Sequence, residues 1–439
     1  MSTVFFSVSP PSPSFPPQFH FKSFKHLSPL KTTLKRPLFS TTTRSSLHVD
    51  PLESDPPLPP SVRTFWKWLA EEGVVSSTCP VPRMLWINPD TVAASEIGYR
   101  CADLKPWVAV YLFLIREKMR GNSPWRFYID ILPGRTDSTL YWSEEELAEI
   151  KGTLLLRMTR EMKEHVESQY HKLFPSSITL DGFLWAFSML RSRAFSHLRG
   201  QLVMLPLVDL INHSASITRE DNAEEINGPA GLFSWDLLFC LKSTMPVKEG
   251  EQVVIQYGLK KSNADLAFYY GFVEPNTNRD SYTLTFNISE SDPFHREKLD
   301  IAAANDLGET AYFDIFMDRP LPPAILPYLR LVALQETDAF FLEPAYRKSI
   351  WKTLELPVSH VNKELVCKMV IDACESALSG YRTTVEQDEK LIQEGNLGYK
   401  LEIAVRVRVG EKRVLQQIEV LSRRRKLNWI SLSITMRGD

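Results

Sequence analysis

The first half of the chain is patterned mainly for helices. RTFWKWLAEEGV, from residue 63, places Phe65, Trp66 and Leu69 at helical spacing, which predicts a short amphipathic helix. Residues 100–190 continue this pattern, and LKPWVAVYLFLIREKMRG ends in basic residues and Gly121, as helices commonly do. SEEELAEIKGT begins with Ser143 ahead of acidic residues, which is typical of a helix N-cap.

TLDGFLWAFSMLRSRAF closes this helical part of the chain. It predicts a helix with a broad apolar stripe, formed by Phe183, Leu184, Phe187, Leu190 and Phe195. Residues 200–290 change to short strand-like pieces, separated by Gly, Asn and Pro: QLVMLPLVDLI, GLFSWDLLFCLKS, GEQVVIQYG and SYTLTFNIS.

Beyond about residue 290, apolar residues again recur every three to four positions, which predicts an all-α C-terminal lobe. The order is therefore an opening helix, a helical insert, a compact β region and a helical lobe. This is an α+β organisation, and 439 residues suit more than one domain.

The N-terminal segment differs in composition from the rest of the chain. It has no Asp or Glu before Asp50 and is rich in Ser, Thr and Pro, with six Lys or Arg residues. This composition is typical of a chloroplast transit peptide, here residues 1–46, although a basic tail that stays attached is the alternative. A proline-rich linker, 47–62, follows it, and we expect no helix there.

Charge and cysteine content narrow the classes of partner. Without the six basic residues of the segment before Asp50, acidic residues outnumber basic ones by about eight, so no general electrostatic attraction to nucleic acid is expected. The cysteines form no C-x-x-C pair, so we expect neither a zinc site nor a disulfide framework. No apolar run approaches the length of a membrane span.

Four short pieces carry residues capable of chemistry: RSRAF, DLINHS, GEQVVIQYG and YYGFVEPN. Asn212 and His213 end an apolar run, and taken alone they suggest a capped turn. Ser214 is a poor partner for His213 in nucleophilic catalysis, because neighbours in a strand point to opposite faces. Tyr257, next to Gly258, is either a core tyrosine or one that faces a cavity. The aromatic residues of YYGF form either ordinary core or a wall that receives a cation.

In this order, the four pieces resemble the SET-domain lysine methyltransferases. In that family the Asn-His segment and the tyrosine segment cross as a pseudoknot beside S-adenosylmethionine. LWINPD, ILPGRTDSTLYWSEEEL, GLFSWD, ETAYFDIF and LPYLRLVAL further resemble the chloroplast Rubisco large-subunit methyltransferase group. The resemblance implies a split, β-rich SET domain at 63–280 with a helical insert at about 100–185. It also implies a helical substrate-binding lobe at 290–417.

The resemblance implies a role for each matched residue. Asn212 and His213 would contact the cofactor, and Arg193 would lie at both the cofactor and the substrate sites. Tyr257 would be the catalytic tyrosine, and Tyr270 would line the lysine channel together with Asp209. The implied reaction is methyl transfer from S-adenosylmethionine to lysine ε-amines of chloroplast stromal proteins. The implied substrates are the Rubisco large subunit, fructose-bisphosphate aldolase, or both.

The sequence also departs from this family. The family's glycine-containing EGLG-type strand precedes LWINPD, but no E-G-x-G occurs in the first 100 residues here. His197 stands where a second arginine is expected and Glu224 where a tyrosine is expected, and both belong to the substrate-binding set. Residues 418–439 lose the preceding amphipathic pattern, which predicts an aberrant tail.

Three functions therefore compete. The first is an active stromal lysine methyltransferase, and the second is a catalytically impaired SET-like module that binds a protein partner. The intact DLINHS and QYG favour the enzyme, and the missing cofactor strand favours the binding module. The third, nucleic-acid association through the basic run SRRRK, conflicts with the acidic balance of the chain.

Overall fold

The computed structural model describes residues 59–72, 81–173, 178–195, 202–217, 223–227, 237–241, 251–275, 277–317, 319–344, 346 and 349–424. The predicted transit peptide, most of the linker, Cys79, His197 and most of the predicted tail lie outside these residues. The side chains of Glu224 and Cys240 are likewise outside the description, although their backbones belong to strands.

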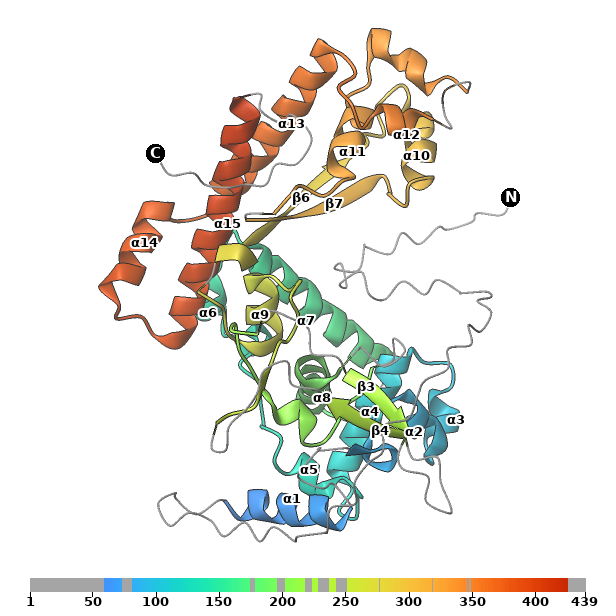
Figure 1. Cartoon of the computed structure of the whole chain (residues 1–439), viewed down its shortest axis with the longest axis vertical. Helices are drawn as coiled ribbons and strands as arrows, with labels where there is room; N and C mark the ends of the chain where they lie inside the picture. The colour runs from blue at the N-terminus through green and yellow to red at the C-terminus, as the bar shows by residue number, and fades with distance from the viewer. Residues whose placement is uncertain are drawn as a thin grey trace, which may run out of the picture. The chain divides into compact units, whose positions relative to one another are not determined.

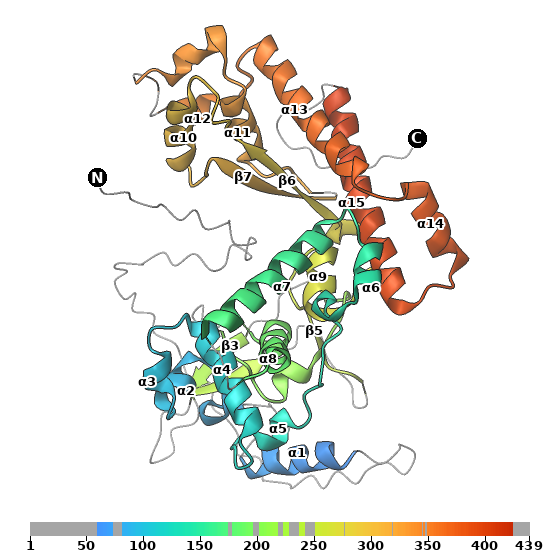
Figure 2. The same cartoon turned by 180° about the vertical axis from the view of Figure 1, so that it is seen from behind.

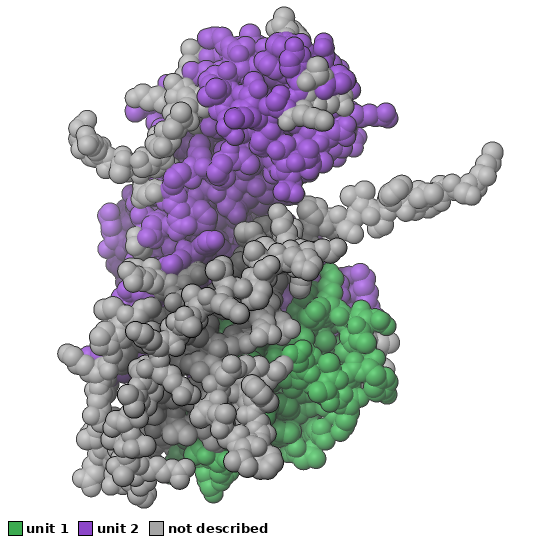
Figure 3. Space-filling model, turned by 45° about the vertical axis from the view of Figure 1, so that its right-hand side comes forward, with its two compact units in different colours: residues 1–132, 195–206, 223–240 green, residues 133–194, 207–222, 241–439 purple. Residues whose placement is uncertain are grey.

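Two compact units divide the chain, coloured separately in Figure 3. The first comprises Met1–Leu132, Phe195–Pro206 and Ala223–Cys240. Its helices are α1 (Pro60–Glu71), α2 (Pro89–Ala94), α3 (Gly98–Cys101), α4 (Pro106–Met119) and α5 (Arg126–Ile129). A sheet in the order β1-β4-β3 contains β1 (Val81–Pro82), β3 (Ala223–Asn227) and β4 (Leu237–Leu241), and β1 runs antiparallel to β4.

Helix α1 begins three residues earlier than the apolar spacing predicts. Pro60 occupies its first turn, where a proline leaves no helical hydrogen bond unmade, so the proline-rich linker ends inside a helix. The prediction of no helix before Arg63 was wrong for this reason. Helix α4 is buried at every position from Val108 to Ile115, as expected of a segment that is apolar all round.

The second unit comprises Pro133–Ala194, Leu207–Asn222 and Leu241–Asp439. Its first helices are α6 (Glu144–Glu149), α7 (Leu154–Leu173) and α8 (Leu180–Arg193). The predicted N-cap at Ser143 is confirmed: its hydroxyl accepts from the backbone of Glu146, and the Glu146 carboxylate accepts from Ser143 N–H. At the start of α8 the Thr179 hydroxyl accepts from the backbone N–H of Gly182, whereas Phe195, predicted on its stripe, lies beyond its end.

In two of the expected strand pieces, QLVMLPLVDLI and GEQVVIQYG, the described strands are shorter than predicted. The run LVMLPLVDLI forms isolated bridges at Val203 and Met204 and a 3₁₀ turn, η4 (Val208–Leu210), because Pro206 and Leu207, whose φ is 80°, turn the chain. The regular strands in or beside these two pieces are β2 (Asn212–His213) and β5 (Val254–Ile255), two residues each, whereas β3 and β4 have five residues each.

YYGF closes helix α9 (Asn263–Tyr270), which Ser262 and Asp265 cap at its start. Gly271 ends the helix with a φ of 77°, and a Cβ there would lie 2.4 Å from the backbone oxygen of Asp137. Both the conformation and the close approach therefore require glycine at this position.

The prediction of an all-α lobe was wrong, because the lobe contains β7 (Thr310–Phe316). This strand pairs antiparallel along its whole length with β6 (Ser281–Asn287). Its alternating burial follows the two-residue period of ETAYFDIF, a pattern that the helical prediction passed over. The α+β class itself is confirmed.

Figures 1 and 2 show the remaining helices of this unit, of which α14 lies apart from the hairpin, beyond α15. They are α10 (His295–Ala303), α11 (Ile325–Val332), α12 (Ile350–Thr353), α13 (His360–Ser379), α14 (Val385–Glu394) and α15 (Tyr399–Arg423). Apart from α14, these helices share one core with the hairpin, which includes Leu284, Phe313, Leu329 and Leu415. Val385 of α14 packs instead with Val405 and Val409 of α15. Ile418 also lies in the hairpin core and α15 continues to Arg423, so residues 418–423 of the predicted tail belong to this helix.

Among the helices that the structure describes, none is both long enough and apolar enough to cross a membrane.

Candidate active site

Two segments more than 40 residues apart in sequence meet at the paired strands β2 and β5. They run parallel, with Asn212 opposite Val254 and His213 opposite Ile255. The register brings Tyr257 back to the start of β2, where its hydroxyl donates to the carbonyl of Ile211 at 2.8 Å. The structure therefore brings together the DLINHS and GEQVVIQYG pieces that the sequence analysis singled out.

Aromatic rings gather around Tyr257. The rings of Tyr257 and Tyr270 lie 4.6 Å apart, and Phe272 stacks on His213 with ring centroids 5.2 Å apart. Burial raises the pKa of Tyr257 above its ordinary value, and the nearby Asp209 raises it further, against the opposing effect of Arg193. The phenol is consequently a neutral hydrogen-bond donor at physiological pH and a poor base.

Arg193 and Asp209 lie beside this tyrosine. Arg193 ends α8, and its Nη1 donates to the backbone carbonyl of Asp209 at 3.0 Å. Its Nε is buried and has no hydrogen-bond partner among the residues that the structure describes. The Asp209 residue is also buried. A cation and an anion therefore flank Tyr257, and one donor of the cation remains available to a ligand.

His213 uses its imidazole inside the protein. Nδ1 accepts a hydrogen bond from the backbone N–H of Tyr257 at 3.2 Å, so this nitrogen carries no proton. Nε2 must then carry the proton and donate to Glu274 Oε1, 2.7 Å away. Burial lowers the pKa of His213, against the raising effect of Glu274, which keeps the ring neutral. Any ligand contact of His213 is therefore left to its backbone.

Glu274 and Arg279 complete this buried cluster, although the sequence analysis gave neither a role. The Nε of Arg279 forms an ion pair with the same Oε1 of Glu274 at 2.6 Å. The side chains of His213, Glu274 and Arg279 are 6%, 7% and 4% exposed. The available signal was Glu274 itself, an acid inside the aromatic and apolar run YYGFVEP, where a carboxylate needs buried partners.

The other predicted site residues are not all brought into this group. Asn212 lies exposed at the start of β2, where its amide can reach a ligand. His197 and the side chain of Glu224 fall outside the described residues, so both remain predictions. Among the residues that the structure describes, no group of His, Cys, Asp and Glu has the arrangement of a metal site.

Comparison with known proteins now places this geometry in a family. Residues 289–415 match the family model of the Rubisco LSMT substrate-binding domain. The chloroplastic ribulose-1,5-bisphosphate carboxylase/oxygenase large subunit N-methyltransferase of Nicotiana tabacum is 52% identical, over 97% of this chain and 94% of that protein. The chloroplastic fructose-bisphosphate aldolase-lysine N-methyltransferase of Arabidopsis thaliana is 55% identical, over 84% of each chain.

A solved structure agrees with these relatives. The crystal structure of the SET domain of LSMT bound to lysine and AdoHcy has a TM-score of 0.80 and 55% identity, and the match covers 85% of this chain and 93% of that one. The alignment with the tobacco protein spans 472 positions, more than this chain can fill, so several dozen positions hold no residue of it.

Proposed function

The chain belongs to the SET-domain protein-lysine N-methyltransferases of the Rubisco large-subunit methyltransferase group, and on that premise we propose that it methylates lysine ε-amines of chloroplast stromal proteins. The candidate substrates are the Rubisco large subunit and plastid fructose-bisphosphate aldolase, the proteins named for its relatives. The observation that carries the proposal is the parallel pairing of β2 with β5, which holds Tyr257 against Ile211.

S-adenosylmethionine is the family's cofactor, and when bound it supplies an electrophilic methyl group on a sulfonium. The residues present fit it. The exposed amide of Asn212 offers donors and an acceptor, and the available Nε of Arg193 suits a carboxylate. We propose that these two side chains, together with the backbone of His213, hold the cofactor.

The lysine must attack as a neutral amine, because an ammonium has no lone pair. Its reference pKa is about 10.4, so a site has to favour loss of the proton. A desolvated channel lined by Tyr257 and Tyr270 would lower the lysine pKa by disfavouring the charged form. Asp209 would balance the incoming cation before the proton leaves.

Tyr257 acts in this proposal as a positioning group and not as a base. Its raised pKa and its bond to Ile211 keep the phenol protonated, and the phenol oxygen can still accept from the amine. The nitrogen lone pair then forms the N–C bond as the C–S bond breaks. Alignment of this kind can supply on the order of 7–11 kcal/mol.

The test is calorimetric binding of S-adenosylmethionine to the full chain, followed by methyl-transfer assays with Rubisco and aldolase. A second chain carries a family-like EGLG segment inserted before LWINPD. Micromolar binding of the cofactor and methyl transfer by the unaltered chain support the active enzyme. Binding only after insertion supports the second candidate, an impaired module that binds protein partners. No binding by either chain contradicts the methyltransferase proposal.

This second candidate rests on specific observations. No E-G-x-G precedes LWINPD, and the tobacco relative has several dozen positions at which this chain has no residue. A partner-binding module would still use residues 289–415, which match a substrate-binding family. Binding of Rubisco or aldolase without methyl transfer would distinguish it from the enzyme.

A further inference from the structure

Arg279 is a buried arginine that grips the segment carrying Tyr257. Its Nη1 donates to the backbone carbonyls of Gly258 at 2.9 Å and of Lys261 at 2.7 Å. Its Nη2 donates to Oε1 of Gln256 at 2.9 Å. The residues immediately before and after Tyr257 are therefore both bound to one guanidinium.

Glu274 fixes the orientation of this guanidinium. Its Oε1 forms an ion pair with Arg279 Nε and accepts from His213 Nε2. Its backbone is held in turn by Asn263 of α9, whose side chain accepts from Glu274 N–H at 2.9 Å and donates to Glu274 C=O at 3.1 Å. The cluster is thus tied to a capped helix as well as to the short strand β2, which carries His213.

His213 forms a further hydrogen bond to the same segment. Its Nδ1 accepts from the N–H of Tyr257, which only the Nε2–H tautomer allows, and Glu274 selects that tautomer by accepting from Nε2–H. Gln256, Tyr257 and Gly258 are each bonded to a member of the cluster. Regular structure contributes little here, because β5 ends at Ile255 and Gly258 has a φ of 142°.

We propose that Glu274 and Arg279 are positioning residues for methyl transfer, which orient Tyr257 through His213 and through the backbone on either side of it. The proposal rests on the methyltransferase function proposed above. In this proposal neither Glu274 nor Arg279 touches the reacting atoms. Loss of either should move the Tyr257 hydroxyl while leaving Asn212 and Arg193, the proposed cofactor contacts, in place.

The experiment uses two variants of the full chain, Arg279→Lys and Glu274→Gln. A lysine is a point charge and cannot reproduce the four contacts of a planar fork, so kcat should fall on the order of 100-fold. Glu274→Gln should lower kcat by about tenfold. Affinity for S-adenosylmethionine, measured by calorimetry, should change by less than about threefold in both variants, because Asn212 and Arg193 are untouched and the His213 backbone stays paired with Ile255.

Arg116→Lys provides a matched control. Arg116 lies on α4 and bonds Glu96 and the buried Glu117, so the same substitution weakens a buried ion pair outside the site. Its thermal midpoint should fall, with kcat unchanged. A second readout needs no turnover: histidine ¹⁵N shifts, assigned to position 213 with a His213→Asn chain, report the tautomer. Wild type should show Nε2 protonated and Nδ1 bare, and in Glu274→Gln the Nε2 resonance should move, because an amide oxygen accepts more weakly than a carboxylate.

The outcomes separate this proposal from the proposed function. Two outcomes would overturn the positioning role and leave the proposed methyltransferase function intact. One is a wild-type kcat in a folded Arg279→Lys chain, and the other is an equal loss of kcat and of cofactor affinity. If Arg279→Lys does not fold, Glu274→Gln decides through kcat and the Nε2 resonance. If wild type itself transfers no methyl group, the proposed function fails. The ¹⁵N readout then still counts: a moved Nε2 resonance supports the bond of Glu274 to His213, and an unmoved one overturns it.

Discussion

The surroundings of Tyr257 and the C-terminal lobe hold their backbones by different means. At the site the paired strands are two residues long, whereas the lobe is built on seven-residue strands and on helices of 20 and 25 residues. The lobe backbone satisfies its own hydrogen bonds over long elements. The site backbone relies on buried side chains, which makes its geometry sensitive to single polar substitutions.

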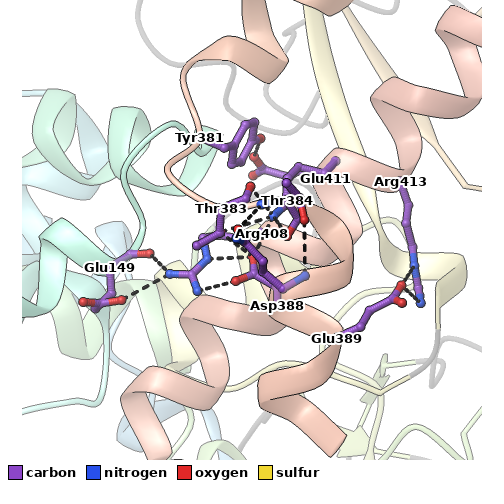
Figure 4. A network of polar contacts seen from close by, with 11 residues as sticks. Glu149, Tyr381, Thr383, Thr384, Asp388, Glu389, Arg408, Glu411 and Arg413 are labelled. Carbon is purple, nitrogen blue, oxygen red and sulfur yellow. Dashed lines mark hydrogen bonds and ion pairs between the residues drawn. The ribbon is translucent and has the colours of Figure 1, made fainter.

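Both regions nevertheless bury charge, and Figure 4 shows how the lobe does so. Asp388 of α14 accepts from Arg408 and Lys412, both on α15, at 2.7 Å each. Burial would raise the pKa of Asp388, but these two cations outweigh it and lower the pKa. In both clusters the cations also donate to backbone carbonyls, Lys412 to those of Thr383 and Thr384 and Arg279 to those of Gly258 and Lys261. The lobe cluster joins helices, and the site cluster shapes a loop.

The largest effect should come from breaking the lobe cluster. Asp388→Ala leaves Arg408 and Lys412, which are 6% and 3% exposed, without their shared carboxylate. Removing one partner of a buried ion pair costs about 3–5 kcal/mol of unfolding free energy. Urea denaturation should show this loss, while cofactor affinity of the folded fraction stays at the wild-type value. A loss under about 1 kcal/mol would mean that the cluster is solvated.

Tyr257→Phe should have the opposite balance of effects, a large fall in kcat and a small loss of unfolding free energy. The lost hydroxyl bond to Ile211 is worth about 1 kcal/mol of stability. If the hydroxyl orients the amine, kcat should fall on the order of 100-fold, which corresponds to about 2.7 kcal/mol. Single-turnover methyl transfer measures it, and Tyr381→Phe, a tyrosine outside the site, is the comparison. Unchanged turnover would remove Tyr257 from the mechanism.

Glu411, a buried acid of the lobe, makes the stability of the lobe depend on pH. Its carboxylate accepts from the backbone of Leu154 and from the Tyr381 hydroxyl, and burial raises its pKa from 4.5 to about 8. The folded state therefore binds this proton more tightly than the unfolded chain. The resulting stability is fully present below pH 4.5 and is lost as the pH rises through about 8.

Glu411→Gln should flatten that loss between pH 5 and pH 8, as thermal midpoints at several pH values would record. Glu161→Gln, at an exposed glutamate of α7, keeps the bonds of Glu411 and should retain the wild-type slope. His213 has the opposite sign, because its lowered pKa removes stability as the pH falls below about 6.5. Equal slopes for wild type and Glu411→Gln would contradict the first of these assignments.

The smallest effect should come from the exposed edge of the same lobe network. Arg413 and Glu389 pair at 2.6 Å but are 41% and 33% exposed (Figure 4). Exposed pairs contribute about 0–1 kcal/mol, because water screens them. Arg413→Ala should therefore lower the unfolding free energy by under 1 kcal/mol, against the larger loss for Asp388→Ala. A comparable loss in both variants would show that exposure does not separate the two pairs.

Local pattern alone was enough for much of the helical structure. The capping sequence at Ser143 and the apolar stripe of α8 identify helices whose formation depends on neighbours three and four residues away. The resemblance of DLINHS and QYG to SET domains likewise led to the correct family. Errors occurred where the signal was ambiguous, as in LVMLPLVDLI, since an apolar run fits a strand, a bridge or a buried turn equally well.

What the sequence determined by itself is the identity of the groups available for chemistry: an amide, an imidazole and phenols in a known order. Only the tertiary structure decided how they are used. It commits the imidazole of His213 to Tyr257 and Glu274, and it brings in Arg279 from a segment with no recognisable motif. The physical reason is that a buried charge is satisfied by whatever donor the fold places within about 3 Å, and that distance is independent of separation along the chain.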